Sequence, residues 1–110
     1  MRTLEPSAFE GAKLLHSPGF LAVCFEADWC GFCTRFLPHF ESRSAQAGIP
    51  FALADLSSED DLRWDTLGIR AVPTLILFKD GEAVWRADAR LGVGLFEKHI
   101  DRMLAAVKRA

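Results

Sequence analysis

Two stretches of the chain are apolar at almost every position, a pattern typical of strands buried on both faces of a sheet. They cover residues 20–26 and 51–56. Between them the period changes, and apolar residues recur at intervals of three and four, which predicts one face of a helix: Cys33, Phe36, Leu37 and Phe40. Pro38 lies inside this segment and should kink the helix.

The C-terminal third predicts a hairpin and a helix. Residues 74–79 and 82–86 flank Asp80-Gly81, a dipeptide typical of a type I′ turn between antiparallel strands. Residues 93–108 then predict a final helix with this apolar stripe: Leu95, Phe96, Ile100, Met103, Leu104 and Val107.

Two short helices are predicted from their start signals. Residues 7–15 begin with Ser7, and Glu10 follows three positions later at capping-box spacing. Residues 57–61 supply caps and first-turn acids for a helix that ends at about Leu67. A helix joins the first two strands, so a right-handed parallel crossover is expected. The sequence predicts a single α/β domain over residues 1–110, with a central mixed sheet flanked by helices.

Composition narrows the classes of function. The 110 residues carry a net charge of −2 and are 50% hydrophobic and 25% charged. The charges form no basic stripe, so nucleic acid and anionic lipid are not expected partners. The apolar runs are far shorter than a membrane span. The N-terminal residues show no apolar signal core, so we expect a cytoplasmic protein, or a periplasmic or secreted one if a signal was removed.

Three cysteines fall within ten residues: Cys24, Cys30 and Cys33. An odd, clustered count is a poor disulfide framework. A structural zinc site would need a second ligand pair, and the histidines show no paired spacing: His16, His39 and His99. We therefore expect neither a metal nor another cofactor.

The position of Cys30 and Cys33 favours redox chemistry. Cys30 is predicted at a helix start, where unpaired N–H groups and the helix dipole favour an anion. Such a position can lower a cysteine pKa from about 8.5 into the ~3.5–7.5 range. Cys33 lies one turn further on, within reach for ring closure, and Gly31 leaves room for a substrate backbone. A redox pair is preferred to two inert buried thiols.

These residues resemble a known family. Residues 27–33, Ala-Asp-Trp-Cys-Gly-Phe-Cys, followed by Pro38, resemble the W-C-G-x-C active site of the thioredoxin family. Residues 68–75 and 78–82 look like the family's cis-proline loop and terminal hairpin. The resemblance covers nearly the whole chain. It implies a thioredoxin-like fold and a thiol–disulfide oxidoreductase that acts on protein disulfides as a monomer. Since no flavin or nicotinamide motif is visible, a reductase or small thiols would supply electrons.

The resemblance also implies roles for residues. Cys30 would be the exposed nucleophile and Cys33 the buried resolving cysteine, and the two would form the redox disulfide. Pro73, in cis, would face the sulfurs and turn the Val72 backbone toward a substrate strand. The expected substrate-binding residues are Trp29, Gly31, Phe32, Val72 and Pro73.

The chain departs from the family near this site. Thioredoxins usually carry a buried aspartate six residues before the first cysteine, where this chain has Cys24, and a tryptophan where it has Glu26. Two alternatives stay open for Glu26: it is the general base for Cys33, with its pKa raised by partial burial, or it is solvated while water accepts the proton. Cys24 is expected to be a small buried hydrophobe. Asp28, His39 and Asp61 are expected to be solvated.

Phe32 replaces the proline common between the two cysteines of thioredoxins, and this dipeptide affects which redox form is favoured. Three functions therefore stay open. The leading hypothesis is a reductase or exchanger of protein disulfides. The first alternative is an oxidase or isomerase in an oxidising compartment. The second is a metal-binding or adaptor module that uses the two thiols.

Overall fold

A computed structural model describes residues 1–109 of the chain. Its centre is a five-stranded mixed sheet in the order β1-β5-β4-β6-β7. The strands are β1 (Arg2–Thr3), β4 (Phe20–Glu26), β5 (Phe51–Asp55), β6 (Thr74–Lys79) and β7 (Glu82–Asp88). This is the mixed sheet that the sequence predicts.

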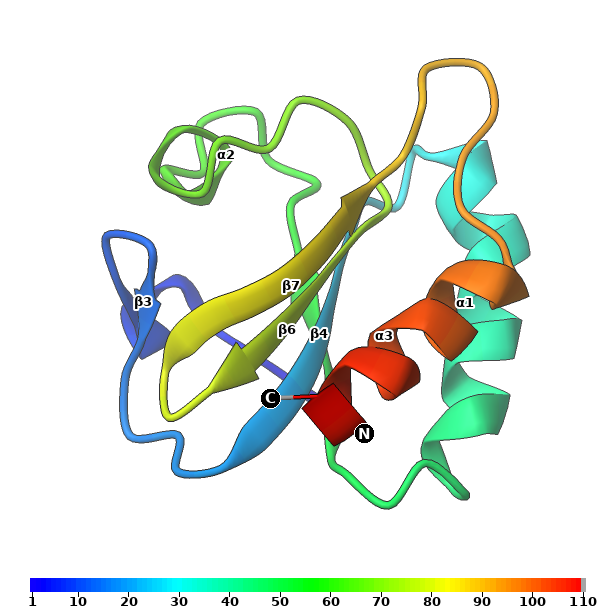
Figure 1. The fold of residues 1–110 in the computed structure, drawn as a ribbon. Coiled ribbons are helices and arrows are strands. Elements are labelled where there is room, and N and C mark those ends of the chain that lie inside the picture. Colours follow the sequence, from blue (N-terminus) through cyan, green and yellow to red (C-terminus); the bar gives the residue numbers. More distant parts are fainter. Residues whose placement is uncertain (110) are drawn as a thin grey trace.

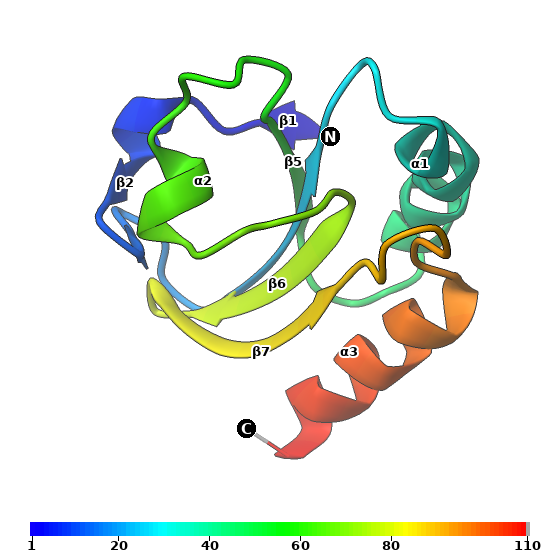
Figure 2. The same cartoon turned by 90° about the horizontal axis from the view of Figure 1, so that it is seen from above.

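Helices and a small hairpin cover the two faces of the sheet. Helices α1 (Gly31–Ser44) and α3 (Glu97–Arg109) lie on one face. Helix α2 (Arg63–Thr66) and the hairpin of β2 (Phe9–Glu10) and β3 (Lys13–Leu14) lie on the other (Figure 1, Figure 2). None of the helices in residues 1–109 is long and apolar enough to cross a membrane.

Strand pairing follows the predicted topology. Strand β4 pairs in parallel with β5, as the helical crossover requires, and it pairs antiparallel with β6 on its other side. Strands β6 and β7 pair antiparallel, as the predicted hairpin requires. In the hairpin turn Asp80 has φ of 51° and Gly81 has φ of 85°, the two positive values that a type I′ turn needs. Both predictions are confirmed.

Strand β4 is buried on both faces, as its apolar run predicts. Val23 and Phe25 pack into the core beneath α2 and the small hairpin. Ala22 and Cys24 pack into the core beneath α1 and α3. Cys24 is completely buried, which agrees with its predicted place as a small hydrophobe.

The predicted helix over residues 7–15 is wrong. The chain instead forms a 3₁₀ turn, η1 (Pro6–Ala8), followed by the β2–β3 hairpin. Gly11 has φ of 58°, which turns the chain back on itself. The Phe9 ring then packs against Phe25 and Phe78, with ring centroids 6.0 and 6.1 Å away. Tertiary packing of one aromatic ring outweighs the local capping signal.

Two other boundaries differ from the prediction. Helix α2 has only four residues. Its N-cap residue, Leu62, makes no side-chain cap, but the Asp61 carboxylate accepts from the N–H of Arg63, the first residue of the helix, at 2.9 Å. The Asp61 carboxylate, which was expected to be solvated, forms an ion pair with the buried Arg63 guanidinium at 2.9 Å. Arg63 also donates to the carbonyls of Leu4 and Asp55, which ties α2 to the sheet. Helix α3 begins at Glu97 because the residues before it form a turn.

Candidate active site

The first turn of α1 holds the two cysteines. Cys30 is the N-cap residue, and its Sγ accepts a hydrogen bond from the Cys33 N–H at 3.2 Å. Cys30 is 7% exposed and Cys33 is 1% exposed. Cys30 is therefore buried rather than exposed as predicted, although it remains the more accessible of the two. An N-cap acceptor is stabilised as an anion by the free N–H groups and the helix dipole.

The loop before β6 lies against the Cys30 sulfur. The Cys30 thiol donates to the Val72 carbonyl at 3.3 Å. The Val72–Pro73 peptide bond is cis, as expected from the resemblance. Both residues are buried. The structure thus brings together, at one end of the sheet, segments that are about forty residues apart in the chain.

Trp29 stands at the edge of the site and is 58% exposed. Its indole N–H donates to the Ser57 carbonyl at 2.9 Å. Its ring stacks on Trp64, with centroids 6.3 Å apart and planes 11° apart. The Trp64 N–H in turn donates to the Ser58 carbonyl at 3.0 Å. The loop after β5 therefore fixes two parallel indoles beside Cys30.

A groove of about 350 Å³ opens beside Cys30. Four predicted substrate-binding residues line it: Trp29, Gly31, Phe32 and Val72. Pro73 is buried and is not among the lining residues. Sequence reasoning missed four others: Trp64, Arg70, Ala71 and Leu91. A second hollow, of about 400 Å³ between η1 and α2, contains neither cysteine.

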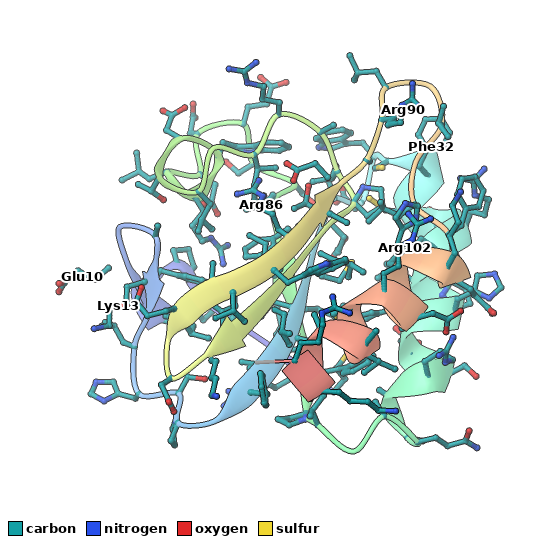
Figure 3. All side chains as sticks on the ribbon, viewed as in Figure 1. Glu10, Lys13, Phe32, Arg86, Arg90 and Arg102 are labelled. Atoms are coloured by element: carbon teal, nitrogen blue, oxygen red, sulfur yellow. The ribbon has the colours of Figure 1, made fainter. Side chains whose placement is uncertain are left out.

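Phe32 is held by a neighbouring turn. The Arg35 guanidinium lies over the Phe32 ring, 5.3 Å from its centroid, and over the Phe96 ring at 4.6 Å. Arg35 also donates to the Val93 carbonyl at 2.7 Å. Figure 1 shows this β7–α3 connection beside the start of α1, and Figure 3 shows Phe32 and Arg90 at the same end of the molecule. Arg35 therefore joins the turn to the residue between the two cysteines.

Cys33 and Glu26 both have raised pKa values. Burial, followed by the hydrogen bond with the Cys30 thiol, raises the pKa of Cys33. Burial also raises the pKa of Glu26, and the carboxylates of Asp55 and Asp28 raise it further. The direction for Glu26 is the predicted one, although carboxylates, rather than a thiolate, supply the neighbouring charge. The Glu26 charge in turn contributes to the raised pKa of Cys33.

Within residues 1–109, no three or more side chains of histidine, cysteine, aspartate or glutamate are grouped so that they could hold a metal ion.

Comparison with known proteins agrees with this geometry. A sequence model of the thioredoxin family, described as "Thioredoxin", matches residues 1–101. A thioredoxin of Rhodospirillum rubrum is 30% identical over 83 residues, which cover 74% of this chain and 79% of that protein. A protein disulfide-isomerase A3 of Gallus gallus is 32% identical over 81 residues, 72% of this chain but only 16% of the isomerase.

Solved structures show the same fold. The crystal structure of Chlamydomonas reinhardtii thioredoxin f2 aligns with a TM-score of 0.71 and 18% identity, covering 99% of this chain and 94% of that one. The family model and the 30% identical relative lead to one conclusion: the chain belongs to the thioredoxin family, whose members are disulfide oxidoreductases.

Proposed function

We propose that this protein reduces or exchanges disulfide bonds of other proteins through Cys30 and Cys33. The observation that carries the proposal is the position of the Cys30 sulfur. It caps the N-terminus of α1, and Cys30 lines the groove that a substrate would enter. The free N–H groups and the dipole at a helix N-terminus favour an anion, and the thiolate is the form of a cysteine that attacks disulfides.

In the proposed reaction the protein dithiol becomes a disulfide and the substrate disulfide becomes two thiols. The Cys30 thiolate attacks one sulfur of the substrate disulfide, and the departing substrate sulfur takes up a proton. Cys33 then loses its proton and attacks the Cys30 sulfur, which closes the Cys30–Cys33 disulfide and releases the second substrate thiol. Two electrons and two protons pass to the substrate. A reductase or small thiols restore the dithiol.

Glu26 is the proposed acceptor for the Cys33 proton. Because burial raises the pKa of Cys33, that residue is a thiol at neutral pH and needs a base before it attacks. Two observations support Glu26: its charge affects the pKa of Cys33, and its own pKa is raised toward the range where a carboxyl exchanges protons readily. Water is the competing acceptor.

Reduction is the proposed direction, in the cytoplasm and as a monomer. Phe32 between the cysteines weakens the expectation of a strongly reducing pair, and one relative is an isomerase. The reduction potential of the Cys30–Cys33 pair separates the roles. A value near about −270 mV fits a thioredoxin-like reductase, and a value near about −180 mV or above fits an isomerase or oxidase.

Insulin reduction by dithiothreitol tests the activity itself. The parent protein should accelerate precipitation of the insulin B chain. Cys30→Ser should lose this acceleration entirely, whereas Cys24→Ser, the matched control in the same strand-to-helix unit, should keep it. Full activity in Cys30→Ser would refute the proposed function.

A further inference from the structure

The groove beside Cys30 is apolar apart from one cation. Arg70 is exposed, and it is the one charged side chain among the residues that line the groove within the described part of the chain. Arg90, also exposed, lies in the turn that carries Leu91. The acids next to lining residues in sequence, Asp28 and Asp65, are exposed but do not line the groove. The one permanently charged side chain in the groove lining is therefore positive, in a chain whose net charge is −2.

Leu91 forms an unusual wall of this groove. Its side chain is 87% exposed although it lies beside the reactive sulfur. The turn that presents it is firmly held. The N–H groups of Val93 and Gly94 both donate to the Arg90 carbonyl at 3.0 Å, and Arg35 binds the Val93 carbonyl. A large apolar side chain held in water beside a binding groove is stabilised when a partner covers it.

The stacked indoles of Trp29 and Trp64 form another part of the groove lining. Both N–H groups are bound to carbonyls of the loop after β5, so the rings present flat apolar surface at little cost in side-chain entropy. An apolar residue of a substrate would fit between these rings and Leu91. A carboxylate beside it would reach Arg70.

We propose that the groove selects disulfides whose reactive cysteine is flanked by an apolar residue and an acidic residue. The apolar side chain lies between Leu91 and the indoles, and Arg70, assisted by Arg90, binds the carboxylate. The proposal rests on the proposed function of Cys30, because the groove selects what that sulfur attacks. Charge complementarity of this kind acts mainly on the rate of encounter and on the choice of partner.

Two peptide disulfides test the proposal in the reduced parent protein. Both carry leucine next to the cysteine, and they differ only by glutamate or lysine at the following position. The glutamate peptide should react faster at low salt, by about two- to fivefold for each arginine engaged. The preference should shrink in 0.5 M NaCl because salt screens exposed charges.

Variants test separately the charged contact with the arginines and the apolar contact with Leu91. Arg70→Gln combined with Arg90→Gln should equalise the two peptides. Lys108→Gln combined with Arg109→Gln, the same loss of two positive charges in the last turn of α3, should keep the preference (Figure 1). Leu91→Ser should slow both peptides alike. For each variant, the two peptide rates are divided by its rate with 2-hydroxyethyl disulfide, a neutral probe too small to span the groove, so that a general change in the reactivity of Cys30 cancels.

The outcomes distinguish this proposal from the proposed function. Equal rates for the two peptides in the parent, with normal reduction of 2-hydroxyethyl disulfide, would overturn the selectivity alone. A preference that survives the double arginine variant, or Leu91→Ser with unchanged peptide rates, would do the same. Failure to reduce any of the three disulfides would overturn the proposed function and the selectivity together.

Discussion

Cys30 and Cys33 lie one helical turn apart, yet their surroundings differ in the way that a two-step exchange requires. The Cys30 sulfur caps α1 and meets the Val72 carbonyl at the groove. Cys33 is almost completely buried, and its pKa is raised by that burial. Cys33 is therefore unreactive until the mixed disulfide at Cys30 brings a sulfur to it and a base removes its proton.

Glu26→Gln tests whether Glu26 is that base. The variant should slow release of reduced substrate, the step in which Cys33 loses its proton, and the rate should no longer fall as the pH drops through the Glu26 titration. Attack by Cys30 should change much less. Stopped-flow tryptophan fluorescence separates the two steps. Restoring the family's acid with Cys24→Asp should partly rescue the variant. Release kinetics identical to the parent would leave water as the acceptor.

The pH dependence of folding stability provides a second test of the raised pKa of Glu26. Its pKa is raised in the folded state, so the folded protein loses stability as the pH rises through that value. Glu26→Gln should then unfold at a higher urea concentration than the parent at pH 8. The difference between their urea midpoints should become smaller toward pH 4. Asp61→Asn is the control of opposite sign. Hydrogen bonds from Arg63 lower the pKa of Asp61, so this variant should be less stable than the parent at pH 8. The difference in stability between Asp61→Asn and the parent should become smaller in acid.

At the scale of elements, the β7–α3 turn is packed against the first turn of α1. Gly94 allows this approach, because a Cβ there would lie 2.8 Å from Arg35 Nη2 and 3.0 Å from Phe32 Cδ1. A β-bridge also joins Arg90 to Gly94. The turn, Arg35 and Phe32 therefore form one unit, and the position of Leu91 at the groove depends on it.

Two glycine variants test this unit. Gly94 has φ of 85° and Gly92 has φ of 76°, so alanine meets similar backbone strain at both, roughly 1–2 kcal/mol. Only Gly94→Ala adds a steric conflict, because nothing lies within 4 Å of a Cβ at Gly92. Gly94→Ala should cost about 1 kcal/mol more in urea unfolding than Gly92→Ala, and it should slow peptide reduction more. Equal losses in the two variants would contradict the packing described.

At the scale of the whole molecule, the sequence predicts those features that depend on local pattern. The buried runs of β4 and β5 and the Asp80-Gly81 turn are periodic or conformational signals, and each appears as predicted. The pairing of β1 with β5 could not be predicted, because two residues carry no period. The helix predicted over residues 7–15 is wrong because its capping signal depends only on neighbouring residues, whereas Phe9 packs against residues far away in the chain.

The residues of the site also differ in whether a local sequence pattern marks them. The cysteines and the Val72–Pro73 loop were found because short motifs mark them in the sequence. Trp64 and Leu91 were missed because no motif marks them, and only the fold brings α2 and the β7–α3 turn to the groove. Arg35 lies outside the apolar stripe that predicts α1, and only the fold shows that it binds the β7–α3 turn and covers Phe32.

Capture of a substrate by single-cysteine variants tests the central claim most directly. Each reduced variant is mixed with insulin, the reaction is quenched with acid, and the adducts are identified by intact mass and peptide mapping. Cys33→Ser should accumulate a mixed disulfide at Cys30, because no second thiol resolves it. Cys30→Ser should capture none. An adduct at Cys33 or Cys24 in Cys30→Ser, together with no adduct in Cys33→Ser, would contradict the assignment of the nucleophile.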